Sequence, residues 1–349
     1  MIHLTYLEAA VVGLVQGVSE MFPVSSLGHN VLIPAIVGGS WARDLNVSSP
    51  ESPYLAFVVG LHVATAIALL VYFWRDWARI ISGFFSSLRD RRVETTDQRL
   101  AWMIILATIP VGIVGLAFEH AFRVIFGKPV YAAIFLAVNG VILIAGERYR
   151  SRASLAADAA IAAERRPAPA AAAARQRELT ASGPPGFTAA RRPAPPAGRH
   201  RSGGQAARPL EMADAVRSDQ RLASMSYPQA VAVGSAQILA LLAGISRDGV
   251  AIVTGMARGL SREDAARFAF LLATPVILAA GALKIPDLFG PLGNGIRGQI
   301  LLASVLSGIG AYLSVRFLLR YLRTRTLTPF GVYCLVAGLA SVIYLGLIK

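Results

Sequence analysis

Apolar segments long enough to cross a lipid bilayer recur along this chain, and they limit its fold more than any other feature. A helix needs about 20 residues to cross a hydrocarbon core of about 30 Å. The 349 residues are 55% hydrophobic with a mean hydropathy of +0.55, which is unlike an ordinary soluble domain or a disordered chain. We therefore predict six full membrane spans, at residues 54–74, 100–118, 130–146, 265–283, 299–319 and 327–348.

Two further apolar regions, residues 4–38 and 227–259, are interrupted near their middle by Pro, Gly and polar residues. We predict that each is a re-entrant helical hairpin rather than a full span. The beginning of the chain carries no Lys or Arg before Glu8, so we expect no cleavable signal peptide. The single cysteine, Cys334, lies in an apolar span, so no intrachain disulfide is expected.

The formal net charge of +14 is concentrated in particular loops. Residues 75–99 hold six arginines, 147–226 hold fourteen and 320–326 hold three, whereas 119–129 and 284–298 each hold two basic residues. The positive-inside rule places the first three segments in the cytoplasm. No nucleic-acid-binding motif accompanies the basic residues, so we expect the anionic inner leaflet, and not a nucleic acid, as their partner.

Residues 147–226 form a Pro-, Ala- and Arg-rich segment between two membrane halves, 1–146 and 227–349. The segment has few large apolar side chains and cannot bury enough surface to offset its chain entropy. We predict a disordered cytoplasmic linker, serving as a spacer or as a binding region for a partner. Between residues 148 and 221, fourteen arginines and six acidic residues contribute +8 of the net +14, so most of the basic character says little about a site.

A weak internal repeat relates the two halves. Gly-Leu-Val-Gln at 13–16 recurs as Gly-Ser-Ala-Gln at 234–237, and Val-Ser at 24–25 recurs as Ile-Ser at 245–246. Each half reads as one hairpin followed by three spans, and an odd number of spans inverts the second half. We therefore predict an all-α polytopic membrane protein with an inverted-topology repeat, both termini outside, and a site near the midplane where the hairpins meet.

The first hairpin gathers groups that are costly at membrane depth, by roughly 2.5–3.5 kcal/mol for a charged residue on insertion scales. Gln16 and Glu20 share a helical face, Pro23 ends the helix, and two serines begin the next one, where free N–H groups attract anions. The candidate functional residues of this hairpin are Gln16, Glu20, Ser25, Ser26 and His29.

The second hairpin supplies Gly244, Ser246, Arg247, Asp248 and Gly249. The glycines permit tight backbone, the serine can cap a helix, and the guanidinium is a planar fork suited to phosphate oxygens. If the two hairpin turns meet, the pocket suits a phosphate ester. Outside this constellation, we interpret His62 as a satisfied histidine of the helix bundle, and Glu8 as either functional or structural.

These motifs resemble the undecaprenyl-diphosphatase family, also called bacitracin-resistance proteins. The family pattern Glu/Gln-x-x-x-Glu followed by Pro-Val-Ser-Ser-x-Gly-His matches Gln16, Glu20 and 23–29, and Pro-Gly-x-Ser-Arg-Ser-Gly matches 243–249 in part. The resemblance implies a multi-pass enzyme of the bacterial plasma membrane. It would hydrolyse undecaprenyl diphosphate to undecaprenyl phosphate at the outer face, recycle the cell-wall lipid carrier, confer bacitracin resistance and depend on Mg²⁺ or Ca²⁺.

Three positions depart from the family pattern. Ala243 replaces Pro, Leu27 occupies a position where Ser or Thr is common, and Asp248 replaces the Ser beside Arg247. The carboxylate of Asp248 could pair with Arg247 and weaken phosphate binding, or it could help to hold a divalent ion.

The resemblance and the motifs together lead to an assignment of roles. Arg247 and the helix starts bind the diphosphate, Ser26 or an activated water attacks the terminal phosphorus, and His29 acts as general base. The predicted catalytic residues are Glu20, Ser26, His29 and Arg247. The predicted substrate-binding residues are Gln16, Ser25, Ser246, Gly244 and Gly249, and the predicted metal ligands are Glu20, Gln16 and Asp248. The expected partners are a polyprenyl diphosphate and membrane lipids, and a homodimer is left open.

Three other functions fit parts of the pattern. A transporter or flippase of lipid phosphates uses the same kind of inverted repeat. An intramembrane serine protease could use Ser26 and His29, but their close spacing beside Glu20 suits acyl transfer poorly. A phosphatidic-acid-type phosphatase needs a histidine after its Ser-Arg segment, and no histidine follows Arg247.

Overall fold

The computed structural model of this chain consists of helices, turns and loops, without strands, over the residues that it describes. These are residues 4–45, 53–126, 128–164, 216–289 and 295–347. The chain divides into two compact units, of which the first comprises Met1–Arg148 and Arg217–Lys349 and the second Tyr149–Val216. All of the predicted site residues belong to the first unit.

Among the described residues, five helices are long and apolar enough to cross a membrane. The candidate spans are Thr96–Phe118 in α6 (Thr96–Phe126), Pro129–Arg152 in α7 (Pro129–Glu164), Arg262–Ala282 in α12 (Arg262–Phe289), α13 (Arg297–Leu322) and α14 (Thr328–Leu347). The sixth predicted span falls on α4 (Pro53–Tyr72), in which Gly60–Tyr72 counts as a shorter apolar helix. This architecture fits a polytopic membrane protein, as the sequence predicts, while the count of six spans stays a prediction.

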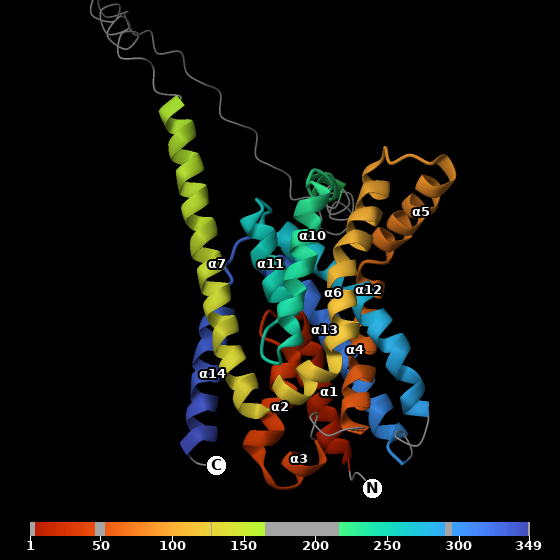
Figure 1. The fold of residues 1–349 in the computed structure, drawn as a ribbon, viewed down its shortest axis with the longest axis vertical. Coiled ribbons are helices and arrows are strands. Elements are labelled where there is room, and N and C mark those ends of the chain that lie inside the picture. Colours follow the sequence, from red (N-terminus) through yellow and green to blue (C-terminus); the bar gives the residue numbers. More distant parts are fainter. Residues whose placement is uncertain (1–3, 46–52, 127, 165–215, 290–294, 348–349) are drawn as a thin grey trace, which may run out of the picture. The chain divides into compact units, whose positions relative to one another are not determined.

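Two broken hairpins occupy the regions where Pro and Gly interrupt the apolar sequence. The first consists of α1 (Tyr6–Met21) and α2 (Ser26–Val37), followed by the short α3 (Gly39–Asp44). The second consists of α10 (Tyr227–Ala236), a 3₁₀ turn η1 (Gln237–Leu241) and α11 (Arg247–Ala257). In Figure 1 the first hairpin enters the unit from the lower end and the second from the upper end, so that their turns approach each other in between.

The start of α1 is fixed by a capping box. The side chain of Thr5 accepts a hydrogen bond from the backbone N–H of Glu8, and the Glu8 carboxylate accepts one from the backbone N–H of Thr5 at 2.8 Å. Glu8 therefore has a structural role, which settles one alternative that the sequence leaves open. At its other end α1 stops just before Pro23, which cannot continue a helix without losing a backbone hydrogen bond.

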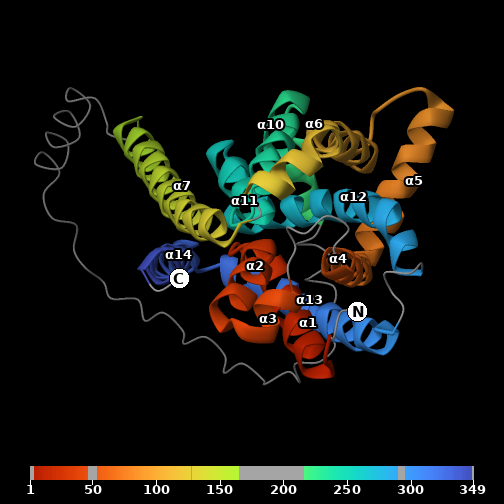
Figure 2. The ribbon, with the colours of Figure 1, turned by 60° about the horizontal axis from the view of Figure 1, so that its bottom comes forward.

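Each hairpin packs closely on a long helix of the other half of the sequence. Helix α1 lies along α13, where a Cβ atom at Gly17 would come within 2.2 Å of the Ser307 carbonyl oxygen. Helix α10 lies along α6, where a Cβ atom at Gly234 would come within 1.8 Å of the Ala107 carbonyl oxygen. Small residues permit such close approach of membrane helices. Figures 1 and 2 both show α1 beside α13 and α10 beside α6.

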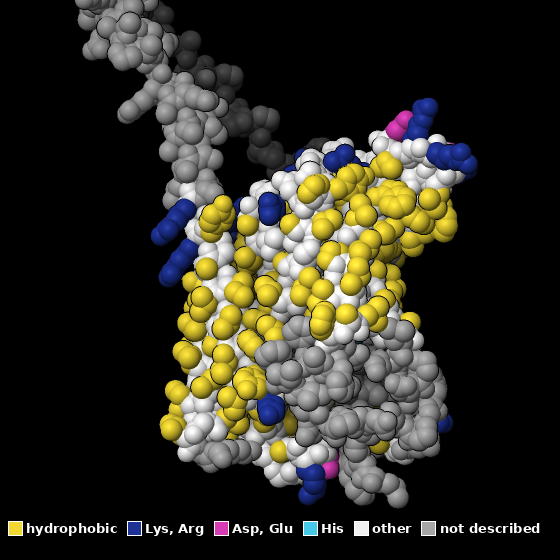
Figure 3. Space-filling view, viewed as in Figure 1, with side chains coloured by type: hydrophobic (Ala, Val, Ile, Leu, Met, Phe, Trp, Pro, Cys, Tyr) yellow, Lys and Arg dark blue, Asp and Glu magenta, His cyan; other side chains and the backbone are white. Residues whose placement is uncertain are grey.

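Helix α5 (Trp74–Asp90) is amphipathic, and its apolar side chains remain largely exposed. Figure 3 shows hydrophobic side chains over α5 and α6, with charged side chains at the outer end of α5. The polar side of α5 binds the helical segment 216–223: Arg79 Nη2 lies 2.6 Å from both Asp76 Oδ1 and Asp219 Oδ2. The ion pairs anchor the chain where it re-enters the first unit.

The predicted disordered linker is shorter than 147–226, because both of its described ends are helical. Helix α7 continues to Glu164 through an alanine-rich sequence, and residues 216–223 form a further helix of about two turns. Alanine has the strongest intrinsic helix propensity, which outweighs the lack of large apolar side chains near the end of α7. The centre of the predicted linker, 165–215, lies outside the described residues.

Candidate functional site

The turns of the two hairpins are in direct contact. Ser25 adopts a left-handed backbone conformation with φ of 68°, which is uncommon for a residue with a side chain. In this position its Oγ accepts hydrogen bonds from the backbone N–H of Gly28 in its own helix and of Gly244 in the second hairpin, both at 3.2 Å. A Cβ atom at Gly28 would come within 2.9 Å of Gly244 Cα, so the two backbones meet closely.

Asn139 of α7 joins the same two turns. Its Nδ2 donates to the carbonyl oxygen of Pro23 at 2.9 Å, and its Oδ1 accepts from the backbone N–H of Ser246 at 3.0 Å. The residue is fully buried. Sequence reasoning missed Asn139, although a lone amide within an apolar span was an available signal, because a buried polar group needs a partner.

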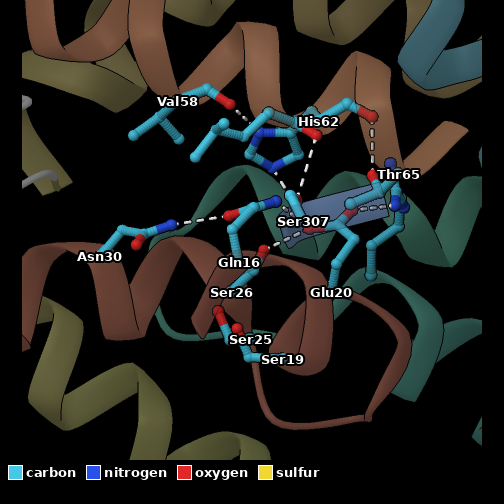
Figure 4. A network of polar contacts seen from close by, with 12 residues as sticks. Gln16, Ser19, Glu20, Ser25, Ser26, Asn30, Val58, His62, Thr65 and Ser307 are labelled. Atoms are coloured by element: carbon cyan, nitrogen blue, oxygen red, sulfur yellow. Dashed lines mark hydrogen bonds and ion pairs between the residues drawn. The ribbon is translucent and has the colours of Figure 1, made fainter. Parts of the chain in front are cut away.

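Glu20 is the centre of the polar network drawn in Figure 4. Its Oε1 accepts from Arg247 Nη2 at 2.5 Å, across a sequence separation of 227 residues. Its Oε2 accepts from Gln16 Nε2 at 2.9 Å and from the hydroxyl of Ser26. The carboxylate is only 5% exposed. The structure thus brings together one catalytic candidate from the second hairpin and three polar residues from the first.

His62 of α4 also reaches Glu20, which sequence reasoning did not anticipate. Its Nε2 lies 3.2 Å from Glu20 Oε2, and its Nδ1 lies 2.8 Å from the carbonyl oxygen of Val58. Figure 4 shows the ring directed from its helix toward Gln16 and Glu20. An ionisable side chain inside a membrane span is a general signal of a functional site, and it would have identified His62.

His29, the predicted general base, has its ring-nitrogen contacts with Ser25 and Tyr333 and not with Ser26. Its Nδ1 lies 2.7 Å from the carbonyl oxygen of Ser25, and its Nε2 lies 2.7 Å from the hydroxyl of Tyr333. The ring also stacks on the Tyr333 ring, with an interplanar angle of 7°. His29 follows Ser25 by one turn of α2, so its ring runs back along the helix, while Ser26 faces Glu20.

The predicted residues of the second hairpin lie at the start of α11. Ser246 caps this helix by accepting from the backbone N–H of Gly249 at 3.1 Å, and Arg247 is its first residue. Asp248 is 1% exposed, and neither of its carboxylate oxygens has a hydrogen-bond partner among the described residues. Its Oδ1 lies 3.6 Å from Arg247 Nε.

This arrangement provides the groups that phosphoryl transfer requires. A guanidinium and the starts of α2 and α11 can bind phosphate oxygens, while a serine hydroxyl is hydrogen-bonded to a carboxylate that can take its proton. Arg247 is paired with Glu20 in this state. A phosphate that binds the guanidinium therefore competes with that carboxylate.

The three predicted metal ligands differ in whether their oxygens are free to bind a divalent cation. The oxygens of Glu20 accept from Arg247, Gln16 and Ser26, and Gln16 Oε1 accepts from Asn30 Nδ2 at 2.6 Å. These oxygens are therefore engaged by donors. Only Asp248 offers carboxylate oxygens without a hydrogen bond, and carboxylate is a preferred ligand of Mg²⁺ and Ca²⁺. In the described part of the chain no group of three or more His, Cys, Asp or Glu could hold a metal ion.

Apolar helices around a buried site with an arginine, a carboxylate and a hydroxyl define a membrane protein suited to handling a phosphorylated lipid. Comparison with known families identifies the class of protein more closely. The model of the family "Bacitracin resistance protein BacA" matches residues 9–167 and 206–340. The chain belongs to this family, as the sequence resemblance indicates.

Relatives named undecaprenyl-diphosphatase match almost the whole chain. It is 56% identical over 345 residues to the undecaprenyl-diphosphatase of Mycolicibacterium paratuberculosis, with 99% of both chains covered. It is 54% identical to undecaprenyl-diphosphatase 2 of Frankia alni, with 96% of both chains covered. It is 35% identical to undecaprenyl-diphosphatase 2 of Chromobacterium violaceum, covering 97% of this chain and 98% of the relative.

Proposed function

We propose that this protein hydrolyses undecaprenyl diphosphate to undecaprenyl phosphate and inorganic phosphate. The names of the full-length relatives support this reaction, and so does the family's link to bacitracin resistance. The observation that carries the proposal is the contact of Ser26 and Arg247 with the two oxygens of one carboxylate, Glu20. With Ser26 as the nucleophile, Glu20 as the base and Arg247 as the phosphate-binding cation, the groups that the proposed reaction needs lie in contact. The reaction would recycle the lipid carrier of cell-wall synthesis.

The first step uses residues of both hairpins. Arg247 turns from Glu20 to the terminal phosphate, and Ser26 Oγ attacks the terminal phosphorus. The Ser26 proton passes to Glu20 Oε2, the bridging P–O bond breaks, and undecaprenyl phosphate leaves with the bonding electrons. Water then cleaves the phosphoserine, which releases phosphate and restores Ser26. In the alternative, Glu20 activates a water that attacks the same phosphorus directly.

Glu20 replaces His29 as the proposed base because of its contact with the Ser26 hydroxyl. His29 would instead support the turn that carries Ser25 and Ser26. Gln16, which was predicted to bind substrate and metal, is here proposed to orient the Glu20 carboxylate. The predicted substrate-binding residues Ser25, Ser246, Gly244 and Gly249 shape the two helix starts that would bind the phosphate.

Dependence on Mg²⁺ or Ca²⁺ is part of the proposal. Asp248 would hold the cation together with phosphate oxygens of the substrate, since its own oxygens carry no hydrogen bond. When bound, such an ion neutralises negative charge on the diphosphate. Glu20 and Gln16 would join it only by giving up their present donors.

The topology of the proposed enzyme is an inverted repeat of one hairpin and three spans, six spans in all. Helix α1 packs on α13, and α10 packs on α6. This supports the arrangement, because the second span of each half then contacts the hairpin of the other half. The distribution of arginines supports a cytoplasmic linker and a site open to the outer face of the bacterial plasma membrane.

Phosphate release from undecaprenyl diphosphate by protein purified in detergent tests the proposal. We expect hydrolysis by the wild type and a loss of at least about 10³-fold in kcat/KM for Glu20→Ala and Arg247→Ala, comparable to the loss of a transition-state donor. Asp248→Ser, which restores the family residue, should keep activity but lower the apparent affinity for Mg²⁺ or Ca²⁺. Wild-type protein that binds the lipid without releasing phosphate would instead indicate the transporter or flippase function that this kind of repeat also supports.

A further inference from the structure

His62 contributes a contact to Glu20 from outside both hairpins. It lies on α4, its side chain is 22% exposed, and its Nε2 lies 3.2 Å from the same oxygen, Oε2, that accepts from Ser26. The opposite oxygen, Oε1, accepts from Arg247. The two basic side chains thus approach opposite oxygens of one carboxylate.

The groups that face the two ring nitrogens of His62 show which of the nitrogens carry hydrogen. His62 Nδ1 lies 2.8 Å from the Val58 carbonyl oxygen, and a carbonyl can only accept, so Nδ1 carries a hydrogen. An ionised Glu20, paired with Arg247, can also only accept. The contact at 3.2 Å is therefore an ion pair in which His62 Nε2 faces Glu20 Oε2.

The helix that carries His62 is itself fixed near this residue. Thr65 Oγ1 donates to the His62 carbonyl oxygen at 2.6 Å, and Ser307 of α13 donates to the Leu61 carbonyl oxygen at 3.4 Å. The ring is therefore presented by a supported backbone. Such support is what holds a functional side chain in a productive orientation.

The proposed reaction explains why Glu20 needs this contact. Arg247 must leave Oε1 when it binds phosphate, and the carboxylate then loses its strongest partner. Gln16 still donates to Oε2, the oxygen that faces the Ser26 hydroxyl, and His62 Nε2 still lies 3.2 Å from it. These two contacts on one oxygen keep it aimed at Ser26 while the other oxygen is released.

We propose that His62 is a positioning residue, which holds Glu20 toward Ser26 after Arg247 has turned to the substrate phosphate. The inference rests on the proposed function, because its role begins when a phosphate draws Arg247 away. His62 does not touch the substrate. Its effect is on the rate of the chemical step, not on the binding of the lipid.

The test compares His62→Leu, which removes the donor, with His62→Gln, whose amide can donate to Glu20 in its place. Ile67→Leu is the matched control, because Ile67 lies on the same helix with 52% of its surface exposed. We expect His62→Leu to lower kcat by about 10²-fold, the cost of a misplaced catalytic group, with KM within about threefold. His62→Gln should recover kcat to within about tenfold of the wild type.

The inference is overturned if His62→Leu keeps the wild-type kcat, or if a folded His62→Gln is as slow as His62→Leu. A second readout does not depend on turnover: the ¹⁵N resonances of labelled His62 should show hydrogen on both ring nitrogens. They should change in Glu20→Ala. A bare Nε2 in the wild type contradicts the inference, whereas wild-type protein without phosphatase activity but with this ¹⁵N pattern contradicts only the proposed function.

Discussion

Single polar residues in apolar helices decide how this site is built. Glu20, Ser26 and Arg247 could be predicted from the sequence because each lies in a dense polar motif beside a helix break. His62 and Asn139 stand alone in their spans, so nothing near them in the sequence names a partner. Their partners come from helices distant in sequence and are set by packing. A polar side chain at membrane depth nevertheless indicates that a partner exists.

The roles of neighbouring residues were harder to predict than their location at the candidate site. Ser26 and His29 lie in one motif, three residues apart, and their predicted roles are an attacking hydroxyl and its general base. In the structure the start of α2 directs Ser26 toward Glu20, while His29 bonds to Ser25 and Tyr333. Spacing along a helix gives the face of a side chain, but the partner on that face belongs to another element.

Asn139 provides a prediction at this scale. Asn139→Ala leaves the Pro23 carbonyl and the Ser246 N–H without their amide partner, and each buried unpaired group costs about 1–3 kcal/mol. We expect a lower melting temperature in detergent and a kcat reduced by roughly 10-fold or more, because both turns of the site shift. Asn139→Asp keeps the acceptor for the Ser246 N–H, so its melting temperature and kcat should lie between those of the wild type and Asn139→Ala. Wild-type melting and kcat in Asn139→Ala would rule out this bridging role.

At the scale of elements, helix starts and breaks are what the sequence reveals best. Thr5, Ser25 and Ser246 each accept from the backbone N–H three residues later, as expected for capping residues. The ends of the linker were predicted less well. The alanine-rich end of α7 has no apolar face that the sequence could reveal, and it is helical through local propensity.

The close packing of α1 on α13 predicts that replacing a glycine by alanine has a different effect at Gly17 than at Gly112. At Gly17 an added Cβ would lie 2.2 Å from the backbone oxygen of Ser307, whereas at Gly112 it would meet nothing within 4 Å. Gly17→Ala should destabilise the protein by about 1–3 kcal/mol, the cost of overpacking. Gly112→Ala should be neutral or stabilising by up to about 1 kcal/mol through helix propensity. Thermal unfolding in detergent measures both, and equal effects would contradict the helix packing.

At the scale of the whole molecule, the site belongs to neither half of the chain alone. The first hairpin supplies the hydroxyl and the carboxylate, and the second supplies the guanidinium. The sequence could predict this division, because the weak repeat pairs two motifs that are each incomplete. It could not predict how the halves are held together, since the Ser25 and Asn139 contacts join backbone groups that carry no sequence signal.

A double-mutant cycle on phosphate release tests most directly whether the two hairpins form one catalytic unit. The enzymes compared are the wild type, Glu20→Gln, Arg247→Gln and the double variant, with kcat/KM measured on undecaprenyl diphosphate. Residues that act as a unit show strongly non-additive effects. We predict that each single variant loses at least about 10³-fold and that the double variant is no more than about tenfold worse than the slower one. Losses that multiply in the double variant would show that Glu20 and Arg247 act independently, and would contradict a single site built from both hairpins.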